Sequence, residues 1–301
     1  MTEGPVAAID CGTNSIRLLI ANEGEDLERR MRIVRLGQGV DRTGRLDPAA
    51  IERTRVALAE YRELIDTHQV KRIRMVATSA TRDAANAPDF HDMVLATLGQ
   101  PAEVITGQEE AALSFAGAVA GLPSGPEYVV VDIGGGSTEF VRGSGDTVTH
   151  SISTDIGCVR MTERHLHTDP PTAAELEALQ RDVSAAVQKG LSHIGTGPAR
   201  LVGLAGSVTT VGAIALGLTK YDRDRIHHSV LSTADVERVA DQLSTLDHAQ
   251  RAEIAVIYPG RVDVIIAGAL ILREIMRSSG FGQVIVSEHD ILDGIAASVA
   301  S

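Results

Sequence analysis

Apolar runs alternate with short polar turns at the start of the chain. Val6 to Ile9 is wholly apolar and enters the polar segment Asp10–Ser15, after which Ile16 to Ile20 forms a second largely apolar run. Arg29 to Leu36 mixes charged and apolar residues and predicts a third strand. Because short apolar runs bounded by turn residues are typical of strands, the chain is expected to open with three consecutive strands.

Later segments alternate between strand and helix patterns. Asp47-Pro48 is an N-cap followed by proline at the first helical position, and Thr172–Glu175 is a capping box. Further strands are predicted over 73–77, 102–105, 128–131, 138–142, 201–204 and 284–286, and further helices over 90–98, 109–121, 232–246 and 291–299. This alternation predicts an α/β fold.

An internal repeat is the most informative feature of the pattern. The segment Asp10–Ser15 matches Asp132–Ser137, and each follows one apolar strand and leads into another. Such a repeat predicts two similar domains, with ligand in the cleft between them. The Pro/Gly-rich stretch Gly121–Pro126 puts the boundary between domains 1–122 and 123–301. In this division, a C-terminal helix at about 289–301 is able to pack back on the first domain.

Composition narrows the class of protein. The formal net charge of -12 argues against sequence-blind nucleic-acid binding, which needs a basic face. The two cysteines, Cys11 and Cys158, lie far apart and are expected to be reduced, buried thiols. The longest clean apolar stretch, Val264–Leu272, has the length of a buried helix and not of a membrane span. A cytoplasmic protein without a membrane or nucleic-acid partner is therefore expected.

Each repeated turn has the composition of a phosphate site. A glycine-rich turn between two strands can direct successive backbone N–H groups at one anion, and Ser15 and Ser137 add hydroxyl donors. Asp10 and Asp132 end the preceding strands, and carboxylates beside phosphate require a hard cation such as Mg²⁺. Neither turn fits the dinucleotide fingerprint, which needs a strand followed directly by a helix.

Six ordered motifs carry a resemblance to a known family. They are Asp10–Arg17, Thr78–Asn86, Gly107–Ala111, Asp132–Glu139, Gly157–Arg160 and Gly203–Ser207. Together they resemble the exopolyphosphatase/guanosine-pentaphosphatase family over nearly the whole chain. The resemblance implies two similar ribonuclease H-like lobes of the actin/hexokinase/heat-shock-ATPase superfamily, with an interdomain cleft, and it also suggests a homodimer.

The resemblance assigns roles to matching positions. Glu110 corresponds to the catalytic carboxylate that orients the attacking water. Asp132 and Glu139, with Asp10 at the first turn, are the candidate ligands for Mg²⁺ or another divalent cation. The candidate substrate- and phosphate-binding residues are Asn14, Ser15, Arg17, Arg82, Gly134, Gly135, Gly136, Ser137, Gly206, Ser207 and Arg261.

The implied activity is metal-assisted hydrolysis of the terminal phosphoanhydride of inorganic polyphosphate, with release of orthophosphate. Guanosine pentaphosphate is an alternative substrate for the same chemistry. Two further alternatives are a superfamily ATPase or kinase and a non-catalytic sensor that binds guanosine tetra- or pentaphosphate. A sensor could dispense with Glu110, and this chain keeps it.

Several positions have plainer interpretations. Glu109 and Glu110 lie at a predicted helix start, where acidic residues favour the helix dipole. Gly203–Ser207 fits a plain turn as well as a ligand-contacting one. The family's Ser-x-x-Gly-Leu-Arg-Glu-Gly segment here runs from Ser287 to Gly294 without its arginine, so any contact made by that arginine elsewhere is not expected in this chain. The chain also ends where longer relatives continue into a helical extension, so weaker processivity on long polymers is expected.

Overall fold

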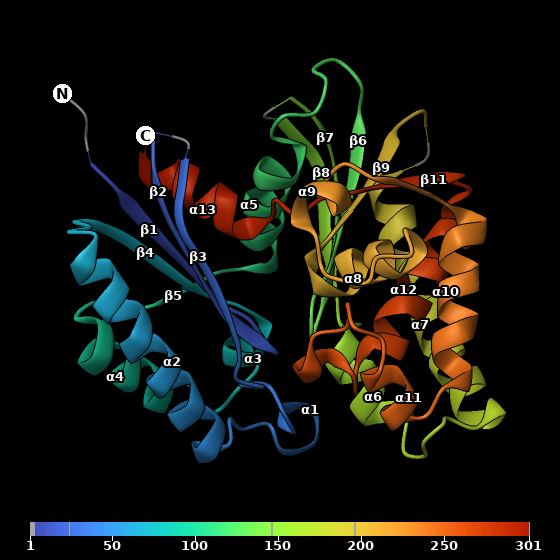
Figure 1. The fold of residues 1–301 in the computed structure, drawn as a ribbon, viewed down its shortest axis with the longest axis horizontal. Coiled ribbons are helices and arrows are strands. Elements are labelled where there is room, and N and C mark those ends of the chain that lie inside the picture. The colour runs from blue at the N-terminus through green and yellow to red at the C-terminus, as the bar shows by residue number, and fades with distance from the viewer. Residues whose placement is uncertain (1–3, 24, 146, 196, 301) are drawn as a thin grey trace. The chain divides into compact units, whose positions relative to one another are not determined.

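The strands of the protein form two mixed β-sheets. The computed structural model describes residues 4–23, 25–145, 147–195 and 197–300. Two compact units divide the chain: Met1–Gly117 with Ile291–Ser301, and Ala118–Asp290. Each unit combines one sheet with helices packed on it (Figure 1). The domain limit between residues 122 and 123 stays a prediction.

The first sheet is built around a three-stranded antiparallel meander. Its strands are β1 (Val6–Cys11), β2 (Ser15–Asn22), β3 (Glu25–Ile33), β4 (Arg72–Ala77) and β5 (Glu103–Val104), in the order β3-β2-β1-β4-β5. Strands β1, β2 and β3 pair antiparallel, whereas β4 is parallel to β1 and β5 is parallel to β4. The parallel pairs require crossovers, which the helices of this unit supply.

The second sheet repeats this plan. Its strands are β6 (Tyr128–Ile133), β7 (Thr138–Ser144), β8 (Thr147–Thr154), β9 (Arg200–Leu204), β10 (Val230–Ser232) and β11 (Gln283–Val286), in the order β10-β11-β9-β6-β7-β8. Strands β6, β7 and β8 pair antiparallel, β9 is parallel to β6, and β11 is parallel to β9. Strands β8 and β10 were not predicted from the sequence.

A shared irregularity strengthens the evidence for duplication. The pairing of β2 with β3 shifts register between Ile20 and Ala21, and that of β7 with β8 shifts at the equivalent step, between Arg142 and Gly143. Bulges of this kind are structural features and not accidents of a strand. The prediction of two similar ribonuclease H-like units is confirmed.

Helices cover both faces of the first sheet. They are α1 (Val40–Thr43), α2 (Pro48–Thr67), α3 (Ser79–Arg82), α4 (Ala87–Leu98), α5 (Gly107–Val119) and α13 (Ile291–Ala300). Alternate residues of β1 point to opposite faces. Ala7 and Ile9 belong to the core that includes α2 and α4, whereas Ala8 belongs to a smaller core that includes α13.

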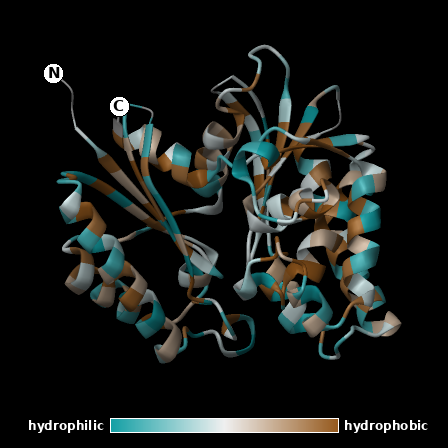
Figure 2. Ribbon diagram, viewed as in Figure 1, coloured by the Kyte–Doolittle hydropathy of each residue, from teal (hydrophilic) through white to brown (hydrophobic). Residues whose placement is uncertain are grey.

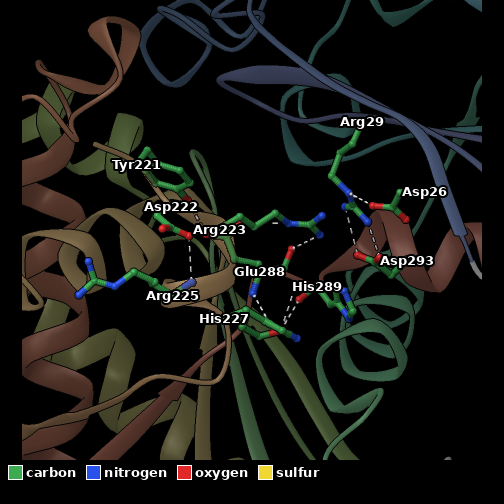
Figure 3. Close-up of polar contacts among 11 residues, drawn as sticks. Asp26, Arg29, Tyr221, Asp222, Arg223, Arg225, His227, Glu288, His289 and Asp293 are labelled. Atoms are coloured by element: carbon green, nitrogen blue, oxygen red, sulfur yellow. Dashed lines mark hydrogen bonds and ion pairs between the residues drawn. The ribbon is translucent and has the colours of Figure 1, made fainter. Parts of the chain in front are cut away.

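The C-terminal helix α13 is an integral part of the first unit. Figure 1 shows it in red against the blue strands β1 and β2, and Ile291 and Ile295 are fully packed there. Arg29 of β3 donates to Asp293 at 2.5 Å, as Figure 3 shows. A Cβ on Gly294 would lie 2.1 Å from the carbonyl oxygen of Leu113, so the helix can approach α5 this closely only with glycine there.

The second unit has a larger helical layer. Its helical elements after α5 are α6 (Cys158–His165), α7 (Ala173–Ile194), α8 (Ala205–Ala215), α9 (Arg223–Ile226), α10 (Thr233–Thr245), α11 (His248–Ala252), the 3₁₀ turn η1 (Pro259–Arg261) and α12 (Ile265–Ser279). The predicted capping box of Thr172 and Glu175 is present at the start of α7. The apolar stretch 264–272 is a buried part of α12, as expected.

Hydropathy follows this layering. In Figure 2, hydrophobic residues concentrate on the strands and on the helix faces turned toward them, while hydrophilic residues cover the outward faces. In the described part of the chain, none of the helices combines the length and the apolar character that a membrane crossing requires.

We expect Gly294→Ala to lower the free energy of unfolding by about 1–3 kcal/mol, the usual cost of overpacking a filled site. The added Cβ would meet a backbone carbonyl, which cannot move aside as a flexible side chain can. Gly282→Ala is the matched control, because its Cβ would meet nothing within 4 Å and should change stability by less than about 0.5 kcal/mol. Denaturant unfolding of both variants checks this, and equal stabilities would contradict the proposed fit of α13.

Candidate active site

The turn between β1 and β2 is held by its carbonyl groups. The Gly12 N–H donates to the carbonyl of Ser15 at 2.9 Å, which closes the turn. The carbonyl of Thr13 accepts from the Gly37 N–H at 2.9 Å, and that of Asn14 accepts from Val34 at 3.0 Å. Within the described ranges, the N–H groups of Thr13 and Asn14 meet no acceptor. The turn therefore presents donors on its outer side.

The turn between β6 and β7 has the same construction. The Gly134 N–H donates to the carbonyl of Ser137 at 3.0 Å. The carbonyls of Gly134 and Gly135 accept from Cys158 and Val159, both at 2.9 Å, at the start of α6. Among the residues that the structure describes, none accepts from the N–H groups of Gly135 and Gly136.

Close packing against α6 fixes this second turn. A Cβ on Gly157 would lie 2.4 Å from the carbonyl carbon and oxygen of Gly135. Arg160 donates from Nε to the carbonyl of Gly136 at 2.7 Å. Because the carbonyls are bonded to α6, successive N–H groups stay on the opposite side. Such a row of donors is suited to an anion.

The two turns differ in the side chains that flank them. Asp10 is opposite Arg17 on the paired strands β1 and β2, and Arg17 donates to its carboxylate at 2.6 and 3.0 Å. At the equivalent place on β6 and β7, Asp132 is opposite Glu139. Both of these carboxylates are buried, and Glu139 accepts from the Ser153 hydroxyl at 2.7 Å.

The two carboxylates beside the second turn supply part of the ligand set that a hard cation needs. Asp132 and Glu139 offer two oxygen-bearing side chains on neighbouring strands, which fits Mg²⁺ with one or two carboxylates and otherwise water or phosphate oxygens. Over the described ranges, no group of three or more His, Cys, Asp or Glu side chains could enclose a metal ion. A cage made only of protein ligands is thus not built here.

Glu110 and Arg82 form an ion pair in the first unit. Glu110 is in the first turn of α5 and is 8% exposed, and its Oε2 lies 3.3 Å from Nη1 of Arg82 at the end of α3. Arg82 also donates to the carbonyl of Ile105 at 2.9 Å. The fold therefore brings together the candidate catalytic carboxylate and a candidate phosphate-binding cation from separate motifs.

The neighbouring Glu109 takes the plain helix-start role. Its carboxylate accepts from the Thr106 N–H at 3.0 Å and from the Thr106 hydroxyl at 3.1 Å. These hydrogen bonds hold the pKa of Glu109 below its usual range. The alternative that both acids only cap the helix therefore applies to Glu109, whereas the Glu110 carboxylate pairs with Arg82.

Gly206 and Ser207 are in a helix, so of the two interpretations of Gly203–Ser207 the plain turn does not hold. They belong to the first turn of α8, which starts directly after β9. Ala205 makes this abrupt change of direction with a φ of 69°, a left-handed conformation that residues with a Cβ seldom adopt. Nothing in the local pattern distinguishes such a helix start from a turn.

Arg261 packs against this helix start. Its Nη1 donates to the Gly206 carbonyl at 3.1 Å, and a Cβ on Gly206 would lie 2.1 Å from the guanidinium carbon. Ser207 is buried, and a Cβ on Gly268 would lie 2.3 Å from its hydroxyl oxygen. Three candidate residues, Gly206, Ser207 and Arg261, are thus neighbours within the second unit.

The segment that lacks the family arginine is held by contacts of Glu288. Tyr221 donates to Glu288 at 2.5 Å, Arg223 lies 3.7 Å from the same carboxylate, and the Glu288 N–H donates to His227 at 3.1 Å (Figure 3). Burial raises the pKa of Glu288, against the effect of the Tyr221 hydrogen bond. Leu292, at the place of the missing arginine, is buried in the core around α13. Sequence reasoning had no signal for the pairing of Tyr221 with Glu288.

Both cysteines are free and buried, as predicted. Burial raises the pKa of each thiol, and for Cys158 a hydrogen bond with Ser207 partly opposes this effect. Cys158 begins α6, where its N–H is bonded to the Gly134 carbonyl. These contacts give Cys158 a structural role beside the turn.

The comparisons with known proteins agree on one protein family. The model of the Ppx/GppA phosphatase family matches residues 20–300. The chain is 51% identical to exopolyphosphatase 2 of Mycobacterium tuberculosis, over 98% of each sequence. It is 40% identical to the crystal structure of an exopolyphosphatase-like protein, with a TM-score of 0.93 over 98% of each chain. It is 34% identical to the Aquifex aeolicus Ppx/GppA family member, with a TM-score of 0.83 over 98% of this chain and 97% of that one.

We expect both thiols to react slowly with a disulfide reagent at pH 8 in the native protein. A raised pKa leaves less thiolate, which is the reactive form, and burial limits access to it. After unfolding in guanidinium, two thiols per chain should react promptly. Absorbance during reaction with Ellman's reagent measures this, and rapid labelling of Cys158 in the native state would contradict its burial.

Proposed function

Because this chain belongs to the Ppx/GppA phosphatase family, we propose that it is an exopolyphosphatase that releases orthophosphate from the end of inorganic polyphosphate. The observation that carries the proposal is the ion pair of the buried Glu110 with the half-buried Arg82. The pair combines a carboxylate that can orient water with a cation that can bind a phosphoryl group. Hydrolysis of a phosphoanhydride needs both groups.

Arg82 binds the phosphoryl group that is transferred. A guanidinium presents a planar fork of donors that matches phosphate oxygens, and it stays charged at any working pH. In the structure its Nη1 is directed at Glu110 and at the Ile105 carbonyl. Substrate oxygens compete with Glu110 for this donor, and the bond to Ile105 keeps Arg82 in position during the exchange.

Glu110 orients and deprotonates the attacking water. Its backbone N–H donates to the Thr106 carbonyl at 2.9 Å, so the residue is fixed in the first turn of α5. Once Arg82 turns to phosphate, the carboxylate is an acceptor for one proton of a water molecule. A positioned general base of this kind raises the rate of reactions in which the protein mainly aligns the nucleophile.

Each turn binds phosphate oxygens within its own unit. In the first unit, the donors are the N–H groups of Thr13 and Asn14, with the Asn14 and Ser15 side chains. In the second unit they are the N–H groups of Gly135 and Gly136, with the Ser137 hydroxyl. Gly134 closes the latter turn, and Gly206, Ser207 and Arg261 add a further polar group in the second unit. The open N–H groups of both turns support this assignment.

Asp132 and Glu139 are the residues that would hold Mg²⁺ or another divalent cation. When bound, that ion supplies positive charge for the developing negative charge on the phosphoryl oxygens. The Ser153 hydroxyl orients the Glu139 carboxylate through a 2.7 Å hydrogen bond. The homodimer, inferred from the family resemblance, and the cytoplasmic location, inferred from composition, stay predictions.

The substrate is tested by measuring phosphate release from polyphosphate, guanosine pentaphosphate and ATP in parallel. We expect polyphosphate to give the highest kcat/KM, because the curated relative at 51% identity bears the exopolyphosphatase name. Faster release from guanosine pentaphosphate would assign the alternative substrate, and preference for ATP would favour an ATPase. Binding of guanosine tetraphosphate without release from any substrate would point to a sensor.

We expect Glu110→Gln to lower kcat by about 10²- to 10⁴-fold, the usual contribution of a general base. Glutamine keeps the size of the side chain but cannot accept the proton. Polyphosphate affinity should stay the same or rise, because the change removes a negative charge near a polyanion and releases Arg82 from its ion pair. Steady-state phosphate release paired with equilibrium binding measures both effects.

Glu109→Gln is the matched control for this variant. It changes the adjacent acid, whose carboxylate bonds to Thr106 at the helix start and is exposed. Turnover should stay close to that of the wild type, with only a small loss of stability. Equal turnover of Glu110→Gln and wild type would remove Glu110 from the mechanism, and equal losses in both variants would indicate a helix-start effect.

A further inference from the structure

We propose that Ser79 is a positioning residue for phosphate binding in the first unit. Its hydroxyl bonds to Thr13 and thereby holds the first turn in a fixed place relative to Arg82. The inference rests on the proposed function, which gives the turn and Arg82 their phosphate-binding roles. Ser79 acts through Thr13 and not by contact with substrate.

A buried pair of hydroxyl groups connects the first turn to α3. Oγ1 of Thr13 lies 2.9 Å from Oγ of Ser79, although the two residues are 66 positions apart in the chain. They are 7% and 4% exposed. Among the residues that the structure describes, neither hydroxyl has another partner. Because a buried hydroxyl that loses its partner destabilises the structure, each group keeps the other in place.

Close packing leaves the Thr13 side chain little room to move. A Cβ on Gly37 would lie 2.3 Å from Cγ2 of Thr13 and 3.0 Å from Cβ of Ala80. The Gly37 N–H also donates to the Thr13 carbonyl at 2.9 Å. Because its carbonyl, methyl and hydroxyl groups are all held, Thr13 cannot rotate. Its N–H and that of Asn14 therefore keep their direction.

Helix α3 connects this pair to the phosphate-binding arginine. Ser79 is the first residue of the helix and Arg82 is the last. The carbonyl of Thr78, directly before the helix, accepts from the Arg82 N–H at 3.1 Å. The Thr78 N–H donates to the carbonyl of Cys11, at the end of β1, at 3.2 Å. One turn of helix thus separates the bond to Thr13 from the guanidinium, so loss of that bond would change the place of the turn relative to Arg82.

The second turn is anchored by backbone groups instead. In the repeat, Gly135 takes the place of Thr13 and has no side chain that could be anchored. Its carbonyl accepts from the N–H groups of Val159 and Arg160 in α6, at 2.9 and 3.1 Å. The anchor of the first turn therefore depends on a side-chain pair that substitution can remove, whereas that of the second does not.

The test is a double-mutant cycle of Ser79→Ala, Thr13→Val and the variant with both changes, with polyphosphate as substrate. Each single variant should raise KM about tenfold, and the double variant should raise it about tenfold and not a hundredfold, because all three lose the same bond. The value of kcat should stay within about twofold of the wild type, since Glu110 is fixed on α5 by its own backbone bond. Equilibrium binding of tripolyphosphate, measured by calorimetry, should weaken by the same factor as KM rises.

Thr54→Val is the matched control for Thr13→Val. Thr54 is fully buried in α2, where its hydroxyl donates to the Ala50 carbonyl at 2.8 Å. This variant should lose stability without a change in KM. Ser79→Thr keeps the hydroxyl and should bind tripolyphosphate more tightly than Ser79→Ala. Thermal unfolding of every variant separates a loss of stability from a loss of affinity.

Each outcome bears on the role of Ser79. If Ser79→Ala keeps the KM and the tripolyphosphate affinity of the wild type, the inference is wrong and the proposed function stands. Additive losses in the double variant, or an equal rise of KM in Thr54→Val, would also overturn it. A wild type that releases no phosphate but binds tripolyphosphate more tightly than Ser79→Ala would refute the proposed activity and support the role of Ser79. A wild type that neither binds nor hydrolyses these compounds would refute both.

Discussion

The rest of the candidate site depends on one constraint, which is that the carbonyl groups of each glycine-rich turn must be bonded on the side away from the ligand. In the second unit this is achieved by the start of α6, which approaches so closely that Gly157 cannot carry a Cβ. In the first unit the segment around Gly37 does the same for Thr13. Only because these carbonyls are held do neighbouring N–H groups face outward together, and a row of such donors is what an anion requires.

The two hairpins of the repeat share one backbone geometry but carry different side chains beside their turns. The turns keep the same closing hydrogen bond and their strands keep the same bulge, so the geometry of each donor row is preserved. The flanking side chains differ: one unit has an acidic residue opposite an arginine, and the other has two acidic residues opposite each other. The two hairpins therefore have the same topology but differ in the charges beside their turns. In the first unit, α3 and α5 add the pairing of Arg82 with Glu110.

Much of this arrangement could be predicted because it is encoded locally. The repeat of Asp10–Ser15 in Asp132–Ser137 marked both turns, and capping residues marked the start of α7 and α10. The edge strands β8 and β10 and the helices α6 and α8 were missed. Strand β8 is polar and half-exposed, so it lacks the apolar run of a buried strand. Helix α8 starts with small residues that equally suit a turn, and only its packing in the core settles the matter.

The sequence by itself determined the fold class, the duplicated turns and the family, because these rest on the order of apolar runs and on short motifs. Tertiary structure alone decided which side chains meet. Glu109 and Glu110 are adjacent acids at one helix start, yet one bonds to Thr106 and the other to Arg82. Asp10 and Asp132 occupy matching positions in the repeat, yet the residue across the neighbouring strand gives one a cation and the other a second acid. Motifs specify residue types along the chain, whereas charge pairing depends on strand register and helix packing, which bring distant residues together.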